Sequence, residues 1–497
     1  AGSTRHLLGD VLRSLQPKYL SQVKDAVRSN LNGPQTVNAT AFVDAASDLV
    51  LEWEEVERRL PTQRRAKVNG KSSQSNQSDN ADEPTVIFYR DSAAWCPYCQ
   101  KVWIALEELQ IPYQVIKIDM RCYGVGKPTD FLRLQPSGNL PCAVINGQVV
   151  QDSDDIIDAL SDGALRPPEH ADRIRDLCDN GRESLERRMY ARWMWWLTGV
   201  RRPQEYRDLM IEHFAELEEA LQHADPFMLG QSISIADIRF LPFVERQIAS
   251  LVYFKGYNPR EDFPNLNRWL SAMEARASYR QTKSDWYTHS QALPPQLAAD
   301  CVAEDGCEES QSRIDYLSTA RPHDATNSTL WDWNEPGWGS HTAKDDRHEV
   351  VRKLVQNHVA VAKFCARGAG TMGSKVVSAK LSDPTAKPNP DVQSAVDVVL
   401  RLIAMALLSG EDGKIEHVSA VASKTMSASS IAALIDCLDY LRARIGVPRD
   451  MSHGAAQEFR RALLKVSVQL SSSCAAAAAV NAVETETEMK EGMVGTK

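Results

Sequence analysis

The sequence lacks any apolar run that approaches the roughly 20 residues needed to cross a bilayer as a helix. It also lacks an excess of positive charge: the 497-residue chain has a formal net charge of −9 at pH 7 and an isoelectric point near 5.8. An acidic balance argues against a general nucleic-acid-binding surface and against binding to acidic membranes. The sequence therefore predicts a soluble protein with no membrane span and no nucleic-acid partner.

Cysteine is too sparse for a disulfide scaffold. The chain has ten cysteines, and apart from Cys96 and Cys99 they are scattered, as is typical of a reducing compartment. A zinc site would need a second Cys-x-x-Cys or a His pair at ligand spacing, and the sequence has neither. We therefore expect no metal.

The Trp-Cys-Pro-Tyr-Cys stretch at 95–99 is the most informative segment. It follows a short apolar run at 85–89 and opens an amphipathic run at 101–109. A Cys-x-x-Cys between a strand and a helix places the first sulfur at the helix N-terminus, where free backbone N–H groups and the helix dipole stabilise a thiolate. We therefore expect Cys96 to ionise more readily than a free cysteine and to act as a nucleophile in thiol–disulfide chemistry. A buried structural pair of cysteines is the alternative.

The residues that follow predict an α/β unit. The segment 113–118 alternates like a half-buried strand. Asn146 and Gly147 lie between two apolar runs, which is the strongest short signal for a hairpin. A helical pattern resumes at 156–160. The order strand, helix, strand, hairpin, helix is typical of a thioredoxin-like unit.

Three segments of this unit carry a family resemblance. Cys-Pro-Tyr-Cys at 96–99, Asn-Leu-Pro-Cys at 139–142 and Gln-Asp-Ser at 151–153 resemble the glutathione-binding half of the glutathione S-transferases. The glutaredoxin-like Cys-Pro-Tyr-Cys is most similar to the cysteine-type classes, which are omega, lambda and dehydroascorbate reductase. The resemblance implies a thioredoxin-like α/β domain followed by an all-α transferase domain, with additional all-α segments at both ends of the chain.

The helical patterns from 170 to 290 resemble the second half of the same family. Within them, Ser234 and Asp237 have the spacing of a capping box, similar to the helix-capping signature of the transferase helical domain. The resemblance extends over residues 84–295. Three further stretches resemble plant and algal transferase-like proteins that are usually plastid-targeted, namely 253–257, 282–289 and 446–451.

The resemblance implies particular roles for residues of this chain. Cys96 is expected to be the nucleophile that forms a mixed disulfide with glutathione, and Cys99 is the resolving thiol if a dithiol cycle operates. Pro141 is expected to be cis, so that the Leu140 backbone pairs with the cysteine moiety of glutathione.

The other expected contacts surround the sulfur. Ser153 is expected to bind the γ-glutamyl carboxylate and Asp152 its ammonium group, although plain helix capping also explains both residues. Trp95 and Tyr98 are expected to flank the sulfur. An aromatic cluster in the helical half is either an acceptor pocket or, more commonly for such a pattern, core: Arg192, Trp193, Trp195 and Trp196.

The predicted function is a glutathione-dependent thiol transferase or reductase, acting in deglutathionylation or dehydroascorbate-type reduction, with glutathione as co-substrate. The other substrate is expected to be a disulfide or an electrophile, on a small molecule or a protein. The competing interpretation is a weakly catalytic or non-catalytic scaffold subunit of a larger assembly, such as a plastid one, because fold does not determine function.

The segments outside the resemblance are expected to bind a protein partner, and the chain is expected to be able to form a homodimer. Its expected location is the chloroplast stroma or the cytoplasm. Because the chain begins with Ala1 rather than Met, we expect a processed sequence, as after removal of an organellar transit peptide. The predicted organisation is a helical N-terminal extension (1–60), a flexible linker (61–83), a thioredoxin-like glutathione-binding domain (84–165), an all-helical transferase domain (166–295), a Trp-containing connector (296–347), an additional helical domain (348–470) and a disordered tail (471–497).

Overall fold

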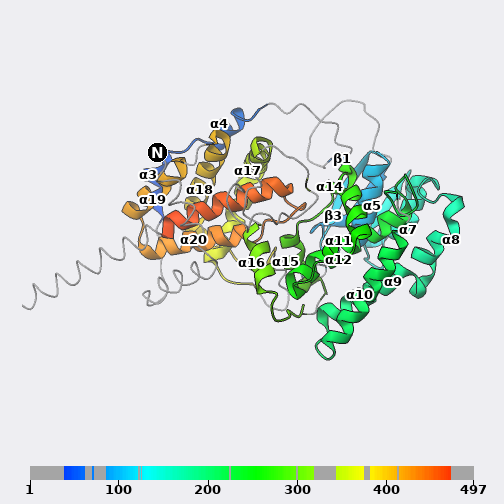
Figure 1. Ribbon diagram of the computed structural model, residues 1–497. Coiled ribbons are helices and arrows are strands. Elements are labelled where there is room, and N and C mark those ends of the chain that lie inside the picture. The colour runs from blue at the N-terminus through cyan, green and yellow to red at the C-terminus, as the bar shows by residue number, and fades with distance from the viewer. Residues whose placement is uncertain are drawn as a thin grey trace, which may run out of the picture.

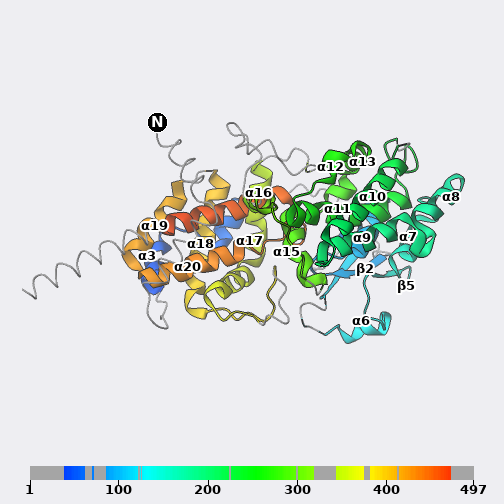
Figure 2. The same cartoon turned by 60° about the horizontal axis from the view of Figure 1, so that its bottom comes forward.

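The structure is a computed structural model in which an α/β unit with its helical partner lies beside a second helical unit (Figures 1 and 2). The two units are joined by chain segments and by direct contacts. The described residues are 39–61, 70–71, 86–120, 124, 126–222, 225–297, 300–317, 338, 343–373, 381–410 and 413–471.

A mixed sheet forms the centre of the α/β unit. Its strand order is β1-β3-β2-β4-β5, with β3 parallel to β2 and the β4–β5 hairpin antiparallel. Asn146 and Gly147 form the hairpin turn with positive φ angles of 50° and 82°, as the predicted turn requires. The strands are β1 (Gly70–Lys71), β2 (Val86–Asp91), β3 (Tyr113–Ile118), β4 (Cys142–Ile145) and β5 (Gln148–Gln151).

Three helices complete this unit. Helix α5 (Pro97–Glu108) begins directly after Cys96, because Pro97 supplies a fixed φ at the first helical position. Helix α7 (Ser153–Ser161) follows the hairpin, and α6 (Thr129–Leu134) is a short helix that the sequence patterns did not predict. The thioredoxin-like fold is therefore confirmed, with one helix more than expected.

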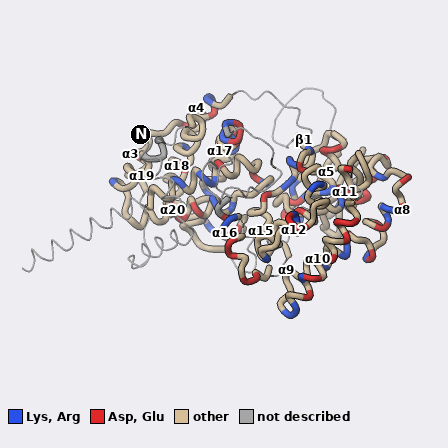
Figure 3. The backbone as a smooth tube through the Cα atoms, in the orientation of Figure 1, with Lys and Arg blue, Asp and Glu red and all other residues tan. Residues whose placement is uncertain are grey.

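The helical partner of the sheet is built around α11 (Ile235–Lys255), which is buried along almost its whole length. The predicted capping box is present at its start, where Ser234 and Asp237 bind each other's backbone. Lys and Arg are interspersed with Asp and Glu along the helices of this unit (Figure 3). Its other helices are η2 (Pro168–His170), α8 (Ala171–Ile174), η3 (Arg175–Asp179), η4 (Gly181–Glu183), α9 (Leu185–Thr198), α10 (Pro203–Ala220), α12 (Pro259–Asp262), α13 (Pro264–Glu274), α14 (Ala277–Arg280), α15 (Trp286–Leu297) and α16 (Glu308–Leu317).

The second helical unit has its own apolar core, which also includes residues of the N-terminal segment, among them Phe42 and Trp53. Segments far apart in the chain thus fold as one body, as the blue and orange ribbons in Figure 1 show. Its helices are α3 (Thr40–Ser47), α4 (Trp53–Arg58), α17 (Ala343–Cys365), η5 (Ala366–Ala369), α18 (Pro390–Ser409), α19 (Gly413–Thr425), α20 (Ala428–Arg442) and a last helix at 453–471.

Helix α18 is the one helix in the described part of the chain that is long and apolar enough to cross a membrane. Of its most apolar window, 61% is buried inside the protein, so it is a core helix of this unit. Its apolar sequence is interrupted by Asp397 and Arg401, which hold the N-terminal segment. Asp397 accepts a hydrogen bond from Trp53 Nε1 at 3.0 Å, and Arg401 pairs with Glu52 at 2.8 Å.

The two predicted connectors contain more structure than expected where they are described. Gly70–Lys71 of the expected linker forms β1 and pairs with β3, and α16 lies inside the expected Trp-containing connector. Trp338 of that connector stacks on His453 with ring centroids 4.1 Å apart. Trp331 and Trp333 lie outside the described residues, as do the helical pattern expected within 1–38 and the expected tail from 472 onward.

Candidate active site

Cys96 lies at the N-terminus of α5, as predicted. It is the N-cap residue, with extended backbone angles (φ −61°, ψ 118°) and Pro97 at the first helical position. The Cys96 side chain is 7% exposed, whereas Cys99, one turn into the helix, is 1% exposed. The Cys96 sulfur lies 4.0 Å from the carbonyl oxygen of Leu140. The first cysteine is therefore the one whose sulfur faces the cis-proline corner.

A buried carboxylate holds the turn that carries Cys96. Asp91, the last residue of β2, accepts hydrogen bonds from the backbone N–H groups of Trp95 (2.6 Å) and Cys96 (3.2 Å) through Oδ2. Its other oxygen is buried without a hydrogen-bond partner in the described structure, and ligand atoms of Asp91, Cys96 and Cys99 lie within 4.8 Å of one another. Sequence reasoning did not single out Asp91, although its position at the end of the strand before the motif was a usable signal.

The second cysteine is in an environment that keeps it protonated. Burial is the largest cause that raises the pKa of Cys99 well above its usual value, and the hydrogen bond with Cys96 raises it further. A protonated thiol is a poor nucleophile. The structure therefore distinguishes the two cysteines, with Cys96 at the surface of the site and Cys99 behind it.

A pocket of about 480 Å³ lies at the Leu140–Pro141 corner. Cys96 is not among its lining residues, but the Cys96 sulfur lies 4.0 Å from the carbonyl oxygen of Leu140, which lines it. The pocket lining includes five of the predicted site residues, which are Tyr98, Leu140, Pro141, Asp152 and Ser153. It also includes five that sequence reasoning left unassigned, although they belong to the same motif segments or adjoin them: Gln135, Pro136, Ser137, Asn139 and Gln151.

The helix start at one side of the pocket is already partly capped. Asp152 Oδ1 accepts a hydrogen bond from the Asp154 N–H at 3.0 Å, so the capping role foreseen for Asp152 is present. Ser153 is the first residue of α7 and 3% exposed, and its hydroxyl has no hydrogen-bond partner among the described residues. The Leu140–Pro141 bond is cis, as predicted. The pocket thus combines a free hydroxyl, a helix N-terminus and the Leu140 backbone.

The two aromatic residues of the motif, Tyr98 and Trp95, differ in whether they line the pocket. Tyr98 lines the pocket, and its hydroxyl accepts a hydrogen bond from Arg187 Nη1 at 3.2 Å. Trp95 does not line the pocket: the guanidinium of Arg246 lies 5.5 Å from the centre of its ring. Arg187 and Arg246 were not predicted, because they come from helices α9 and α11, far along the chain.

The aromatic cluster of α9 is mainly core. Trp193 and Trp196 are each 1% exposed, and their indole N–H groups donate to Ser250 and Glu304. Trp195 is 46% exposed, with the Arg192 guanidinium 4.5 Å from its ring centre. None of these four residues lines the pocket at the Leu140–Pro141 corner.

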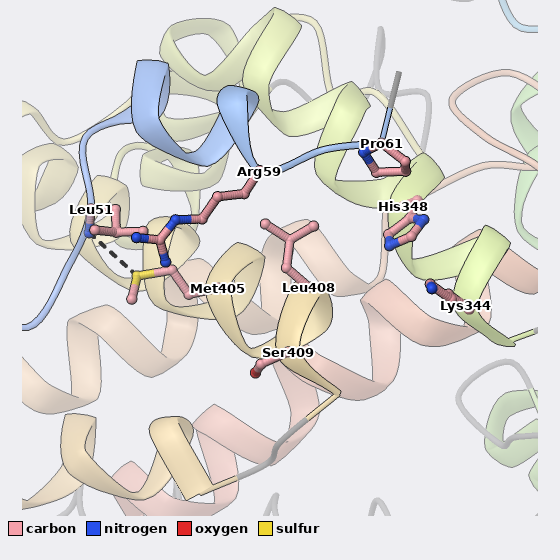
Figure 4. Close-up of a pocket in the computed structure, with 8 residues that line it drawn as sticks. All are labelled: Leu51, Arg59, Pro61, Lys344, His348, Met405, Leu408 and Ser409. Atoms are coloured by element: carbon pink, nitrogen blue, oxygen red, sulfur yellow. Dashed lines mark hydrogen bonds between the residues drawn. The ribbon is translucent and has the colours of Figure 1, made fainter. Parts of the chain in front are cut away.

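A second cavity, of about 400 Å³, lies in the other helical unit between the N-terminal segment, α17 and α18. In Figure 4 the Arg59 side chain extends toward Leu51 and Met405, whereas His348 and Lys344 lie on the other side of Leu408. Arg59 and Lys344 do not converge on one point, and burial lowers the pKa of His348, so the described lining forms no defined anion site.

Two family models match the chain. Residues 95–162 match the N-terminal domain of glutathione S-transferases, and residues 168–272 match the C-terminal domain. Residues 95–162 and 168–272 therefore match the two domains of glutathione S-transferases in the order of that family, within a longer chain.

Three relatives are similar to this part of the chain. The chain is 28% identical over 206 residues to "Probable glutathione S-transferase DHAR1, cytosolic" of Oryza sativa subsp. japonica, covering 40% of this chain and 88% of the relative. It is 23% identical to the chloroplastic glutathione S-transferase DHAR3 of Arabidopsis thaliana, covering 38% and 69%. It is 29% identical to glutathione S-transferase L1 of Arabidopsis thaliana, covering 42% and 88%.

Two solved structures are similar to part of the chain. A dehydroascorbate reductase of Chlamydomonas reinhardtii is 21% identical, with a TM-score of 0.32, and covers 40% of this chain and 92% of its own. The omega-class glutathione transferase 3C of Trametes versicolor is 22% identical, with a TM-score of 0.35, and covers 48% and 97%.

Proposed function

We propose that this protein is a glutathione-dependent thiol transferase or reductase in which Cys96 is the nucleophile. The observation that carries the proposal is the position of Cys96. Its sulfur lies at the start of α5, 4.0 Å from the Leu140 carbonyl at the edge of the pocket. A helix N-terminus favours a thiolate over a thiol.

In this proposal the pocket binds glutathione. The γ-glutamyl carboxylate would lie at the start of α7, where the Ser153 hydroxyl and backbone N–H are unoccupied. The backbone of Leu140 would pair with the cysteine moiety, which places the glutathione sulfur near Cys96. Asp152 would meet the glutathione ammonium group with the carboxylate oxygen that does not cap the helix.

The reaction is a pair of thiol–disulfide exchanges. The Cys96 thiolate attacks the glutathione sulfur of a mixed disulfide, forms Cys96–S–SG and releases the substrate thiolate, which takes up a proton. A second glutathione thiolate then attacks the Cys96–S–SG bond, which yields oxidised glutathione and restores the Cys96 thiolate. The net reaction converts one mixed disulfide and one glutathione into one thiol and one oxidised glutathione.

The environment of Cys99 favours this one-cysteine cycle over an internal disulfide. Burial raises its pKa well above the usual value, so little thiolate is available at neutral pH to attack Cys96–S–SG. The acceptor in this proposal is a glutathionylated thiol or dehydroascorbate, the latter as the resemblance of the Cys-Pro-Tyr-Cys motif to the dehydroascorbate reductase class implies. We propose a reducing location, in the chloroplast or the cytoplasm as in the names of two of the relatives.

Turnover of the mixed disulfide of 2-mercaptoethanol and glutathione tests the proposal. We expect Cys96→Ser to lose at least about a hundredfold in kcat/KM, because the substitution removes the nucleophile. Cys99→Ser should stay within about threefold of the wild type, because its thiol is not used. Equal large losses in both variants would mean a dithiol cycle, and no loss in Cys96→Ser would leave Cys96 without a catalytic role.

The second candidate is a scaffold subunit. It is favoured by the second helical unit, which has a core of its own. This unit also forms a buried junction with the helical partner of the α/β unit, where Arg460 pairs with Asp285. A protein with this role would enter a complex through the added helices, or through a homodimer, while Cys96 turns over little or no substrate.

A further inference from the structure

A buried arginine binds the residue that precedes Cys96. Arg246 of α11 is 1% exposed, and its Nε and Nη2 groups both donate to the carbonyl oxygen of Trp95. The N–H of the same residue donates to Asp91. Trp95 is therefore held at both ends of its backbone, which fixes the turn that presents the Cys96 sulfur.

Arg246 is itself held in place by Gln100 and Glu245. Its Nη1 donates to Gln100 Oε1 at 2.6 Å, and Gln100 Nε2 donates to Glu245 Oε2 at 2.8 Å. Glu245 Oε1 accepts from the Ser284 N–H at 2.9 Å and from His289 Nε2 at 2.6 Å. Both glutamate oxygens are thus engaged, and a buried guanidinium and carboxylate neutralise each other behind the Cys96 turn.

The segment 282–289 continues these contacts into the second helical unit. The Ser284 hydroxyl donates to the Val447 carbonyl, and the Val447 N–H donates to Thr288 Oγ1 at 3.1 Å. Asp285 pairs with Arg460 at 2.7 Å. Every one of these side chains is at most 5% exposed. The segment 282–289 therefore contacts Glu245 through the Ser284 N–H and His289. It contacts the second helical unit through the Ser284 hydroxyl and Asp285.

We propose that Glu245 and Arg246 are positioning residues for Cys96, and that the contact of Val447 with Ser284 holds them in place from the second helical unit. The inference rests on the proposed function, because the proposed function gives Cys96 a reaction to perform. A hydrogen-bonded network buried in a low-dielectric interior transmits the loss of one member to its neighbours. The second unit is thereby part of the thiol site.

The charge of Arg246 gives a reason for an effect on reactivity. Among the described residues, the titratable and charged groups that interact with Cys96 include Asp91 from β2, Cys99 from α5 and Arg246 from α11. Arg246 is the cation among these three. A cation that is held near a sulfur in a poorly solvated site stabilises the thiolate more than it would in water. If Glu245 loses its fixed partners, Gln100 holds the guanidinium less firmly, although Arg246 still donates to the Pro242 and Trp95 carbonyl oxygens. Cys96 then becomes a slower nucleophile.

The test is the rate at which iodoacetamide alkylates Cys96 in the full-length protein, followed against pH and assigned by peptide mass spectrometry. Ser284→Ala removes the contact with Val447. Its matched control is Tyr287→Phe, which removes the hydroxyl that donates to the Ala443 carbonyl at 3.1 Å across the same junction but does not touch Glu245. Arg246→Lys keeps the positive charge but removes the two hydrogen bonds that the guanidinium donates to the Trp95 carbonyl oxygen.

We expect Ser284→Ala to slow alkylation at pH 7 by about threefold and to move the inflection of the rate to higher pH, whereas Tyr287→Phe stays close to the wild type. Arg246→Lys should slow it by about tenfold or more. Thermal unfolding of each variant establishes that the protein is folded at the assay temperature. If Arg246→Lys does not fold, the Ser284→Ala and Tyr287→Phe pair decides the question alone.

An unchanged rate in Ser284→Ala would overturn the inference. So would an equal slowing in Ser284→Ala and Tyr287→Phe, because that result would show general loosening of the junction. The assay contains neither glutathione nor a disulfide substrate. A protein whose Cys96 responds as expected but turns over no substrate would therefore contradict the proposed function and leave this inference standing.

Discussion

Cys96 and Cys99 have the same side chain in two environments, one turn of helix apart. Cys96 sits at the start of α5 with its sulfur near Leu140, while burial raises the pKa of Cys99. The sequence motif was enough to predict which of them lies at the helix N-terminus, because the first cysteine of a Cys-x-x-Cys between a strand and a helix falls at the helix start. The residues that hold the turn, Asp91 and Arg246, were not predicted. Arg246 comes from α11, and no local pattern relates it to the motif.

The free hydroxyl of Ser153 leads to a prediction about glutathione affinity. Ser153→Ala should raise the KM for glutathione by about tenfold with little change in kcat, because a lost binding contact of this kind costs about 1.5 kcal/mol. Steady-state kinetics with varied glutathione measures both quantities. Ser161→Ala is the matched control at the other end of α7, and it should leave the KM unchanged. A fall in kcat at constant KM would place Ser153 in the chemistry instead of in binding.

The carboxylate of Glu245 leads to a prediction about acid stability. Burial alone would raise its pKa, but the hydrogen bond and charge of His289 and the charge of Arg246 lower it from 4.5 to about 2. A group whose pKa is depressed on folding stabilises the protein above its unfolded pKa, and this stability is lost as the pH falls. The contribution is about 3 kcal/mol and should disappear between pH 5 and pH 2.

Chemical denaturation at several pH values compares the wild type with Glu245→Gln. The difference in unfolding free energy between the two proteins should shrink as the pH is lowered through that window. Parallel curves for the two proteins would show that Glu245 carries no depressed pKa.

At the scale of elements, helices that begin with a capping signal were predicted well. Asp237 accepts hydrogen bonds from the backbone of Ser234 and Met228 and from the indole of Trp269. Helix α6 was missed because its six residues are too few to show a helical period. Strand β1 was missed because two residues in a polar stretch carry no strand pattern.

The capping box of α11 leads to a prediction about stability. Asp237→Ala should lower the free energy of unfolding by about 3 kcal/mol, because it leaves buried N–H groups without acceptors. Ser427→Ala, at the exposed cap of α20, is the matched control and should cost about 1 kcal/mol. Urea denaturation of both variants measures the difference. Equal losses would mean that Asp237 acts only as an ordinary cap.

At the scale of the whole molecule, sequence patterns could not show how the segments of the chain fit together. The N-terminal segment packs on the second helical unit, where Trp53 Nε1 donates to Asp397 of α18. The junction around Asp285 and Arg460 had no sequence signal, because a salt bridge between residues that far apart leaves no local pattern.

That buried ion pair leads to a prediction about the junction. Arg460→Met should lower the free energy of unfolding by about 3–5 kcal/mol, because buried Asp285 then loses its guanidinium partner and keeps only the Thr288 N–H and the His453 ring 3.8 Å away. The double variant with Asp285→Asn should lose clearly less than the sum of the single variants, since it removes both charges. A double-mutant cycle by denaturation measures the coupling. Strict additivity would mean that the two residues do not interact, contrary to the structure.

The most direct measurement of the central claim is the intact mass of the protein after treatment with oxidised glutathione, followed by peptide mapping. The account predicts one glutathione adduct on Cys96 in the wild type and in Cys99→Ser, and none in Cys96→Ser. A protein that acquires no adduct, or whose adduct maps to a cysteine other than Cys96, would contradict it.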